Sequence, residues 1–204
     1  MRVTLDNDIN LAAVGEQWLG IARGVDDFAF LSIGTGLGAG LVLRGELHRG
    51  RNGAAGEVDL VSSGLPEDLD PCAAAVSELA ERYAVQSSVP TSLTAPYDAR
   101  AVFTAARAGD EVALRVVAEE ARRIALHIVP IAAVTDVALV VIGGGIGTNG
   151  DLVLEPIRAM LTEWLPFPPA VEISTLGDAA VLSGALAVGL RSATDNVFAT
   201  RRSS

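Results

Sequence analysis

The stretch Ser32-Ile33-Gly34-Thr35-Gly36-Leu37-Gly38-Ala39-Gly40 decides the fold of this chain. Its glycines stand at alternate positions between two apolar runs, residues 28–33 and 40–43, which predict antiparallel strands joined by a turn. Glycine adopts φ > 0 and lets backbone N–H groups approach a ligand, which is how proteins bind phosphate or another anion. The stretch therefore predicts either an anion-binding loop or a plain tight hairpin.

Helical and strand-like patterns alternate along the rest of the chain, which is typical of an α/β domain. Pro130 is expected to kink or end its helix, and residues 64–96 read as surface loop around one short helix. The further predicted strands are 46–48, 137–142 (buried and parallel) and 171–174, and the predicted helices are 8–18, 73–83, 98–108, 110–134, 151–164 and 179–191.

Charge and composition narrow the classes of function. A net charge of −10 argues against nucleic-acid binding by these residues alone, because binding to the phosphate backbone depends on Lys and Arg. One cysteine, Cys72, excludes an internal disulfide and is expected to be inert. The first residues lack an apolar signal region, and the most apolar stretch, 124–142, contains His127, Pro130 and Asp136, so we expect a cytoplasmic protein without a membrane span.

Four segments together resemble the ROK family of repressors, open reading frames and sugar kinases. They are 5–16 with its Asn7-Asp8 pair, 28–57 with the glycine-rich stretch, 140–145 ending in Gly-Gly-Gly, and 173–185. The resemblance implies an α/β fold, the second lobe of an actin-like ATPase (ribonuclease H-like) domain with a mixed sheet and flanking helices.

The resemblance extends over only the second half of a family member. A complete member begins with an Asp-x-Gly-Gly-Thr phosphate loop in a first lobe, and repressors carry a winged helix-turn-helix before it. We therefore expect residues 1–20 to be a helix entering from a first lobe, 21–178 the C-terminal lobe, and 179–204 a final helix and tail packing toward the first lobe.

The family's functional positions carry over residue by residue. Asp8 matches the base of the kinases, and Asn7, Asp8 and Glu57 match sugar contacts. Without the family, Asp8 is as readily a helix cap and Glu57 a solvated loop residue. The matches to phosphate and nucleotide contacts are Gly34, Thr35, Gly36 and Gly38 in the second phosphate loop and Gly143, Gly144 and Gly145 in the adenosine-side turn, which could also be only a strand-to-helix turn.

One departure from the family concerns zinc. After the matching glutamate the family continues with Ile-Gly-His and a cysteine cluster that hold structural zinc, whereas this chain has Val58-Asp59-Leu60 and a single thiol. Four ligands are needed to close such a site, so we expect no zinc or other bound metal. His48 and His127 are expected to be packed or surface residues.

These matches and departures give two main hypotheses. The first is the sugar-sensing lobe of a homo-oligomeric transcriptional regulator of the xylose-repressor or N-acetylglucosamine-repressor type, which meets DNA only through a domain outside these residues. The alternative is an ATP-dependent sugar kinase, glucokinase-like, which would use ATP and Mg²⁺. Because the first phosphate loop is missing, this chain alone is not expected to phosphorylate sugars. A remnant without function is a third possibility.

Overall fold

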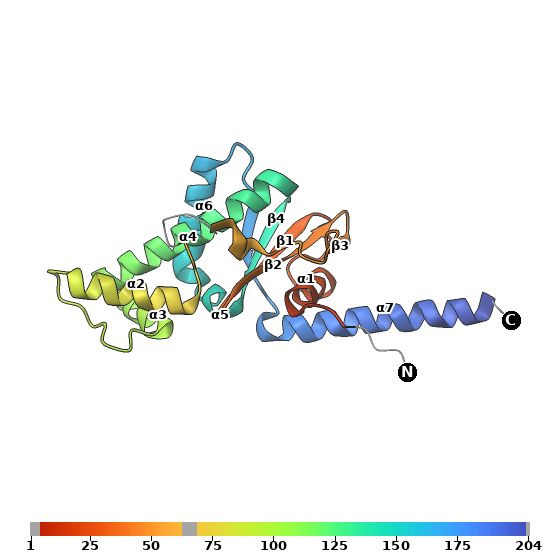
Figure 1. Cartoon of the computed structure of the whole chain (residues 1–204), viewed down its shortest axis with the longest axis horizontal. Coiled ribbons are helices and arrows are strands. Elements are labelled where there is room, and N and C mark those ends of the chain that lie inside the picture. The colour runs from red at the N-terminus through yellow and green to blue at the C-terminus, as the bar shows by residue number, and fades with distance from the viewer. Residues whose placement is uncertain (1–4, 63–68, 203–204) are drawn as a thin grey trace.

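A mixed five-stranded sheet forms the centre of the computed structural model, which describes residues 5–62 and 69–202 (Figure 1). The strand order is β3-β2-β1-β4-β5. Antiparallel pairs join β1 (Phe28–Ile33) to β2 (Leu37–Leu43) and β2 to β3 (Glu46–His48). β4 (Leu139–Gly143) runs parallel to β1, and β5 (Ala170–Ile173) runs parallel to β4.

Strand β1 is buried on both sides because alternate side chains enter different cores. Phe28 and Phe30 belong to one cluster, whereas Ala29, Leu31 and Ile33 belong to the other. β4 divides its side chains in the same way. A strand covered on both faces needs a continuous apolar run, and both of these strands have one.

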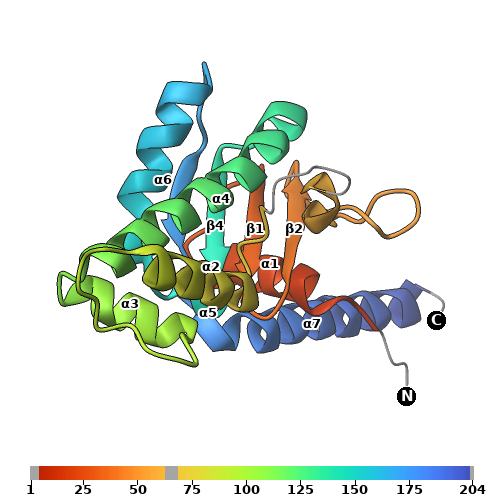
Figure 2. The same cartoon turned by 60° about the vertical axis from the view of Figure 1, so that its left-hand side comes forward.

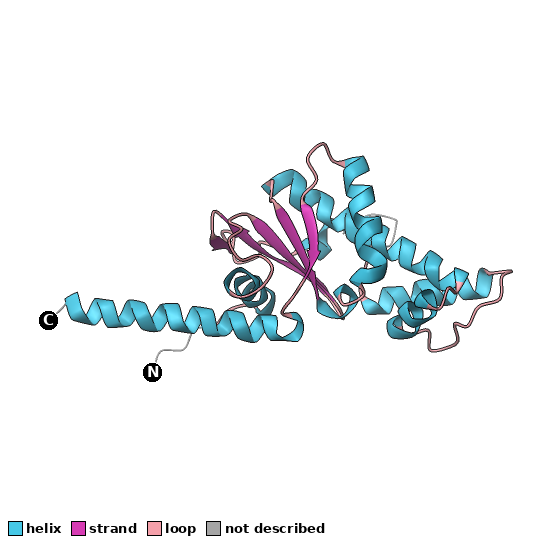
Figure 3. Ribbon diagram, turned by 180° about the vertical axis from the view of Figure 1, so that it is seen from behind, coloured by secondary structure: helices cyan, strands magenta, loops and turns pink. Residues whose placement is uncertain are grey.

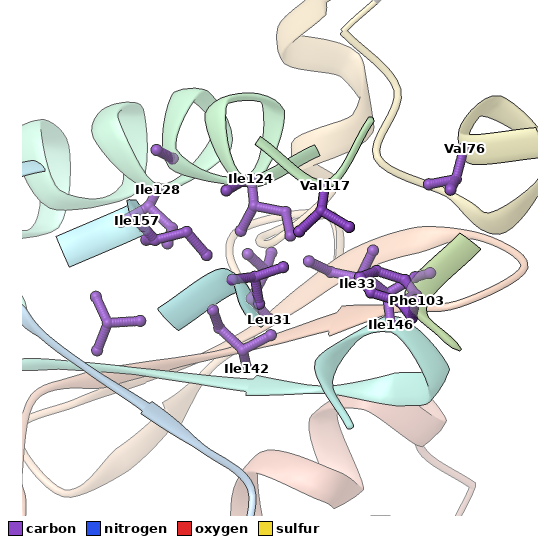
Figure 4. Packing of buried hydrophobic residues seen from close by; sticks show 14 of the residues in the cluster. Leu31, Ile33, Val76, Phe103, Val117, Ile124, Ile128, Ile142, Ile146 and Ile157 are labelled. Atoms are coloured by element: carbon purple, nitrogen blue, oxygen red, sulfur yellow. The ribbon is translucent and has the colours of Figure 1, made fainter. Parts of the chain in front are cut away.

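The larger core lies between the sheet and four helices (Figures 2 and 4). The longest of them contributes Val117, Ile124 and Ile128, which face Leu31 and Ile142 of the sheet. The helices are α2 (Ala73–Gln86), α3 (Ala99–Arg107), α4 (Glu111–Thr135) and α6 (Gly150–Trp164); short elements complete the chain: α5 (Gly144–Gly147) and the 3-10 turns Val58–Ser62 and Gly177–Ala179.

On the opposite face, α1 (Asp8–Trp18) packs on the sheet and α7 (Ala180–Arg202) crosses α1, extending beyond the sheet as a single helix (Figures 1 and 3). The crossing depends on two glycines. A Cβ atom on Gly15 would lie 2.2 Å from the carbonyl oxygen of Ala180, and one on Gly184 would lie 1.7 Å from that of Leu11. The two backbones therefore meet where neither helix has a side chain.

The buried carboxylate of Glu16 adds further contacts near the crossing of α1 and α7. Glu16, with no exposed surface, accepts hydrogen bonds from the Ser174 hydroxyl, from Leu176 N at 3.3 Å and from Ile21 N at 2.9 Å. Donors from the end of α1 and from the segment after β5 thus share one acceptor. Burying a charge is costly unless such donors satisfy it, so the hydrogen bonds to Glu16 hold α1 and the segment after β5 together.

Most predicted elements are confirmed, with shifted ends. β2 begins at Leu37 instead of 40, so the loop before it is only three residues long and Gly38 lies in the strand. α4 runs from Glu111 through Pro130 to Thr135, close to the predicted range 110–134, so the proline does not end the helix. α7 runs to Arg202 instead of 191. In the predicted loop region, residues 63–68 lie outside the described residues. No helix in the described part of the chain is long and apolar enough to span a membrane.

The glycine crossing predicts opposite effects for two alanine substitutions in α7. Gly184→Ala should lower the free energy of unfolding by about 1–3 kcal/mol, because its methyl group collides with backbone. Gly189→Ala meets no atom within 4 Å and should raise stability by up to about 1 kcal/mol through helix propensity. Urea unfolding of both variants measures this, and equal effects would contradict the close crossing.

Candidate functional site

The two glycine turns lie side by side. Ser32 pairs with Gly143 in the parallel register of β1 and β4, so the turns that follow these strands leave the same edge of the sheet. A Cβ atom on Gly34 would lie 3.7 Å from Gly145 N. Gly144 has φ +78°, and a Cβ there would lie 2.3 Å from the carbonyl oxygen of Ile33. The second turn therefore packs on the end of β1 in a way that requires glycine.

Within the two turns, the open positions can be told apart from the packed ones. Thr35, Gly36, Gly144 and Gly145 are exposed, and no atom lies within 4 Å of a Cβ built on Gly36 or Gly145. Gly143 instead lies against the ring of Phe30, 2.4 Å from a Cβ position. A ligand could therefore approach the backbone at Thr35–Gly36 and at Gly144–Gly145.

Helix α1 is seated on β2 by the remaining glycines of the first stretch. A Cβ on Gly38 would lie 2.5 Å from Ile9 Cδ1, and one on Gly40 would lie 2.8 Å from Ala13 Cβ. Both glycines are buried. Gly38 thus gives the helix room to pack, and this packing brings the first turn of α1 next to the β1–β2 turn.

At the start of α1, the capping role belongs to Asn7. Its Oδ1 accepts hydrogen bonds from Ile9 N at 2.8 Å and Asn10 N at 3.2 Å. This commits the amide oxygen and leaves the Nδ2 group to donate. Asp8 is the first helical residue, is exposed, and accepts a hydrogen bond from Ile9 N at 2.8 Å. The carboxylate of Asp8 is therefore directed to solvent at the helix start.

The loop carrying Glu57 is pinned to the same strand. Gly56 has φ +97°, and its carbonyl oxygen accepts from Ala39 N at 2.8 Å. A Cβ on Gly56 would lie 1.9 Å from the Ala39 carbonyl oxygen, so only glycine permits this approach. An ion pair between Arg49 and Asp6 joins the loop to the residues just before α1. Glu57 follows the contact and is exposed.

The tertiary structure therefore gathers the candidate residues from four distant segments around the end of β1. Asn7, Asp8 and Glu57 lie beside the start of β2, and the two glycine turns lie at the ends of β1 and β4. This arrangement offers acceptors for hydroxyl groups next to exposed backbone N–H groups.

Sequence reasoning missed a pocket on the other side of the β1–β2 turn. It has a volume of about 300 Å³ and is lined by Thr35, Gly36 and Leu37 together with Asp59, Asp70, Cys72 and His127. His127 is buried and its Nδ1 contacts the Arg123 carbonyl oxygen at 2.9 Å. No local motif joins these residues, because only the packing of α4 and the start of α2 against the turn brings them together.

Burial and neighbouring carboxylates, foremost Asp70, raise the pKa of Cys72 to about 12. The thiol is therefore neutral at physiological pH, which agrees with the inert role expected for it. In the described part of the chain, no group of three or more His, Cys, Asp or Glu side chains could hold a metal ion. The absence of zinc stays a prediction.

Glu120 of α4 is fully buried, and neither of its carboxylate oxygens has a hydrogen-bond partner. Burial raises the pKa of Glu120 well above its usual value. The positive charge of Arg123 acts in the opposite direction, and repulsion from Asp70 and Glu119 adds to the increase. The carboxyl group is accordingly held toward its neutral form.

A model of the ROK family matches residues 1–191. The chain belongs to the ROK family. The glucokinase of Halalkalibacterium halodurans is 33% identical over 206 residues, which cover 89% of this chain and 62% of that enzyme. The xylose repressor of Caldicellulosiruptor bescii is 27% identical over 205 residues, covering 91% of this chain and 51% of the repressor. The chain thus spans between half and two thirds of the length of these relatives.

A solved structure agrees with the fold. The ROK glucokinase of Streptomyces griseus, in complex with glucose and AMPPNP, superposes with a TM-score of 0.77 and 30% identity, covering 91% of this chain and 67% of the enzyme. The fold is α/β, of the actin-like ATPase class, with a mixed sheet and flanking helices. The predicted family and fold class are confirmed.

The raised pKa of Glu120 predicts a specific dependence of stability on pH. The folded state binds this proton more tightly than the unfolded state, so the contribution of Glu120 to stability falls as pH rises above the unfolded value near 4.5. Glu120→Gln removes this loss and should unfold at higher urea than the wild type at pH 8, with a smaller difference at pH 4.5. A difference independent of pH would contradict the neutral buried carboxyl group.

Proposed function

We propose that this chain is the lobe of a ROK-family sugar kinase that carries the sugar-binding carboxylates and the nucleotide-side turns. The observation that carries the proposal is the close packing of the turn at Gly34–Gly36 against the turn at Gly143–Gly145, beside the start of α1. A sugar sensor needs only groups that bind hydroxyls. The pair of glycine turns with exposed backbone, next to those groups, suits a phosphate-bearing co-substrate.

Each candidate side chain has a distinct role in this proposal. Asp8 accepts the proton of the sugar hydroxyl that attacks the phosphoryl group, as a base within hydrogen-bond reach of that hydroxyl. Asn7 donates from Nδ2, because its oxygen is committed to the helix cap. Glu57 accepts hydrogen bonds from further hydroxyls. Thr35, Gly36, Gly144 and Gly145 offer the open backbone positions to the nucleotide.

Phosphoryl transfer by ATP also uses Mg²⁺. The described residues do not provide a cluster of carboxylate or histidine ligands that fits a metal ion, so no step is assigned to a metal held by this lobe. The charge of the phosphates must be balanced mainly by groups outside these residues.

The regulator hypothesis keeps one specific observation in its favour. After Glu57 the chain has Val58-Asp59-Leu60 and lacks the histidine and cysteines that the kinases and many relatives use around zinc. The similarity to the xylose repressor is consistent with this hypothesis. In this second candidate function the same sugar site would respond to ligand by changing the arrangement of two lobes in an oligomer.

The exposed face of α7 supports the proposed division of the chain. Val181, Leu182, Leu186 and Leu190 are 39–65% exposed on this helix. Apolar patches of this kind usually mark a contact surface. We propose that residues 179–204 pack against the first lobe of the longer protein, and that residues 1–20 enter from it.

The sugar site is tested by two isosteric substitutions. Asp8→Asn and Glu57→Gln should each weaken binding of glucose by roughly tenfold to a hundredfold, because each removes a charge-assisted acceptor worth about 1.5–3 kcal/mol. Glu46→Gln, on exposed β3, is the matched control and should leave affinity unchanged. Calorimetric titration gives all three results, and unaltered binding in both site variants would place the sugar elsewhere.

Kinase and regulator are separated by ADP release from the full-length protein. A kinase should release ADP only when sugar is present, and Asp8→Asn should abolish this release because it removes the base while keeping the shape of the side chain. Glu46→Gln should keep it. Sugar binding without sugar-dependent ADP release would instead support the regulator.

A further inference from the structure

Helix α3 packs beside the turn at Gly143–Gly145 and the residues that follow it. Phe103 of α3 is 1% exposed and points toward Ile33 at the end of β1 and Ile146 in α5 (Figure 4). One helical turn later, Arg107 is the last residue of α3. Residues four apart lie on the same face of a helix, so Arg107 is directed to the same part of the molecule as Phe103.

Arg107 makes a fork-like contact with the residues just after α5. Its Nε donates to Asp151 Oδ2 at 2.6 Å, and its Nη2 donates to Asp151 Oδ1 at 2.6 Å and to Asn149 Oδ1 at 3.0 Å. The hydrogen bond from Arg107 also lowers the pKa of Asp151. Both oxygens of the carboxylate are thus held by one planar group, which fixes their orientation.

Asn149 carries this contact into the glycine turn. While its Oδ1 accepts from Arg107, its Nδ2 donates to the carbonyl oxygens of Gly145 at 3.3 Å and Ile146 at 3.1 Å. Thr148 Oγ1 donates to the Gly145 carbonyl oxygen at 2.8 Å. No atom from outside α5 lies within 4 Å of a Cβ position on Gly145, so these side-chain hydrogen bonds are the contacts through which the segment after α5 holds the Gly145 carbonyl group.

We propose that Arg107 is a positioning residue for the turn at Gly143–Gly145, acting through Asp151 and Asn149 and not through contact with ligand. The inference rests on the proposed nucleotide role of this turn. A turn that binds through its backbone has no side chains to adapt, so its affinity depends on having its peptide groups already oriented. Arg107 supplies that orientation from a helix that the family motifs do not include.

The hydrogen-bond network of Arg107, Asp151 and Asn149 lies near the surface, so its loss should affect local structure more than global stability. Arg107 and Asp151 are 41% and 53% exposed, and exposed ion pairs add little to global stability. Loss of the network should therefore loosen the turn locally and leave the core unchanged. Local opening of this kind is measured by amide hydrogen exchange.

The test uses hydrogen exchange with mass spectrometry on the full-length protein, with and without Mg²⁺ and ATP. Arg107→Gln should speed exchange of the peptide covering residues 143–150 by about threefold to tenfold, with β1 unchanged, and should weaken the protection that ATP gives there. Arg158→Gln is the matched control, because Arg158 makes similar contacts to Glu172 and the Val171 carbonyl oxygen but holds α6 to β5.

The conservative variant Arg107→Lys, which keeps a charged donor toward Asp151 and Asn149, separates positioning from a general loss of structure. Restored slow exchange at 143–150, with restored protection by ATP, supports the proposal. Wild-type exchange in Arg107→Gln, while ATP protects the wild-type turn, overturns the role of Arg107 alone. No protection by ATP in the wild type overturns the nucleotide role of the turn, and with it this proposal.

Discussion

The parallel pairing of β1 with β4 is the constraint on which the rest of the structure depends. The two strands belong to parts of the chain more than a hundred residues apart, and their register places Ser32 opposite Gly143. Both strands therefore end at one edge of the sheet, and both continue into glycine turns there. The position of Gly144 against the Ile33 carbonyl oxygen follows from this register, as does the open face shared by Gly36 and Gly145.

A second set of contacts places the carboxylates. Gly38 and Gly40 let α1 lie directly on β2, and Gly56 lets the next loop approach the same strand at Ala39. Close backbone packing of this kind tolerates no added methyl group, so it fixes positions more tightly than side-chain packing does. On its far side α1 is held by α7 through Gly15 and Gly184 and by the buried Glu16. The helix that begins with Asp8 is thus constrained on both faces.

The two proposed sets of contacts belong to separate parts of the structure. The proposed sugar contacts belong to α1 and the loop before Val58, whereas the proposed nucleotide-side turns follow β1 and β4. Each can be kept or altered while the other is preserved. In this chain both sets are present and the zinc-binding residues of the family are not. Retention of the nucleotide side is the reason for favouring the kinase.

The sequence by itself determined the family and the order of helices and strands, because these depend on local glycine patterns and apolar periodicity. It also assigned α1 its bounds, since Asp and Asn at a helix start are a local signal. It could not decide that Asn7 and not Asp8 caps the helix, because both residue types serve equally well as caps.

Only the tertiary structure decided the remaining features. The start of β2 at Leu37 depends on neighbours that pack against this segment, and local propensity gives way to such packing. The pocket with Asp70 and His127 and the contact from Arg107 to Asn149 both join residues from separate segments. Contacts between segments distant along the chain leave no periodic or local signal, and for that reason they appear only when the chain is folded.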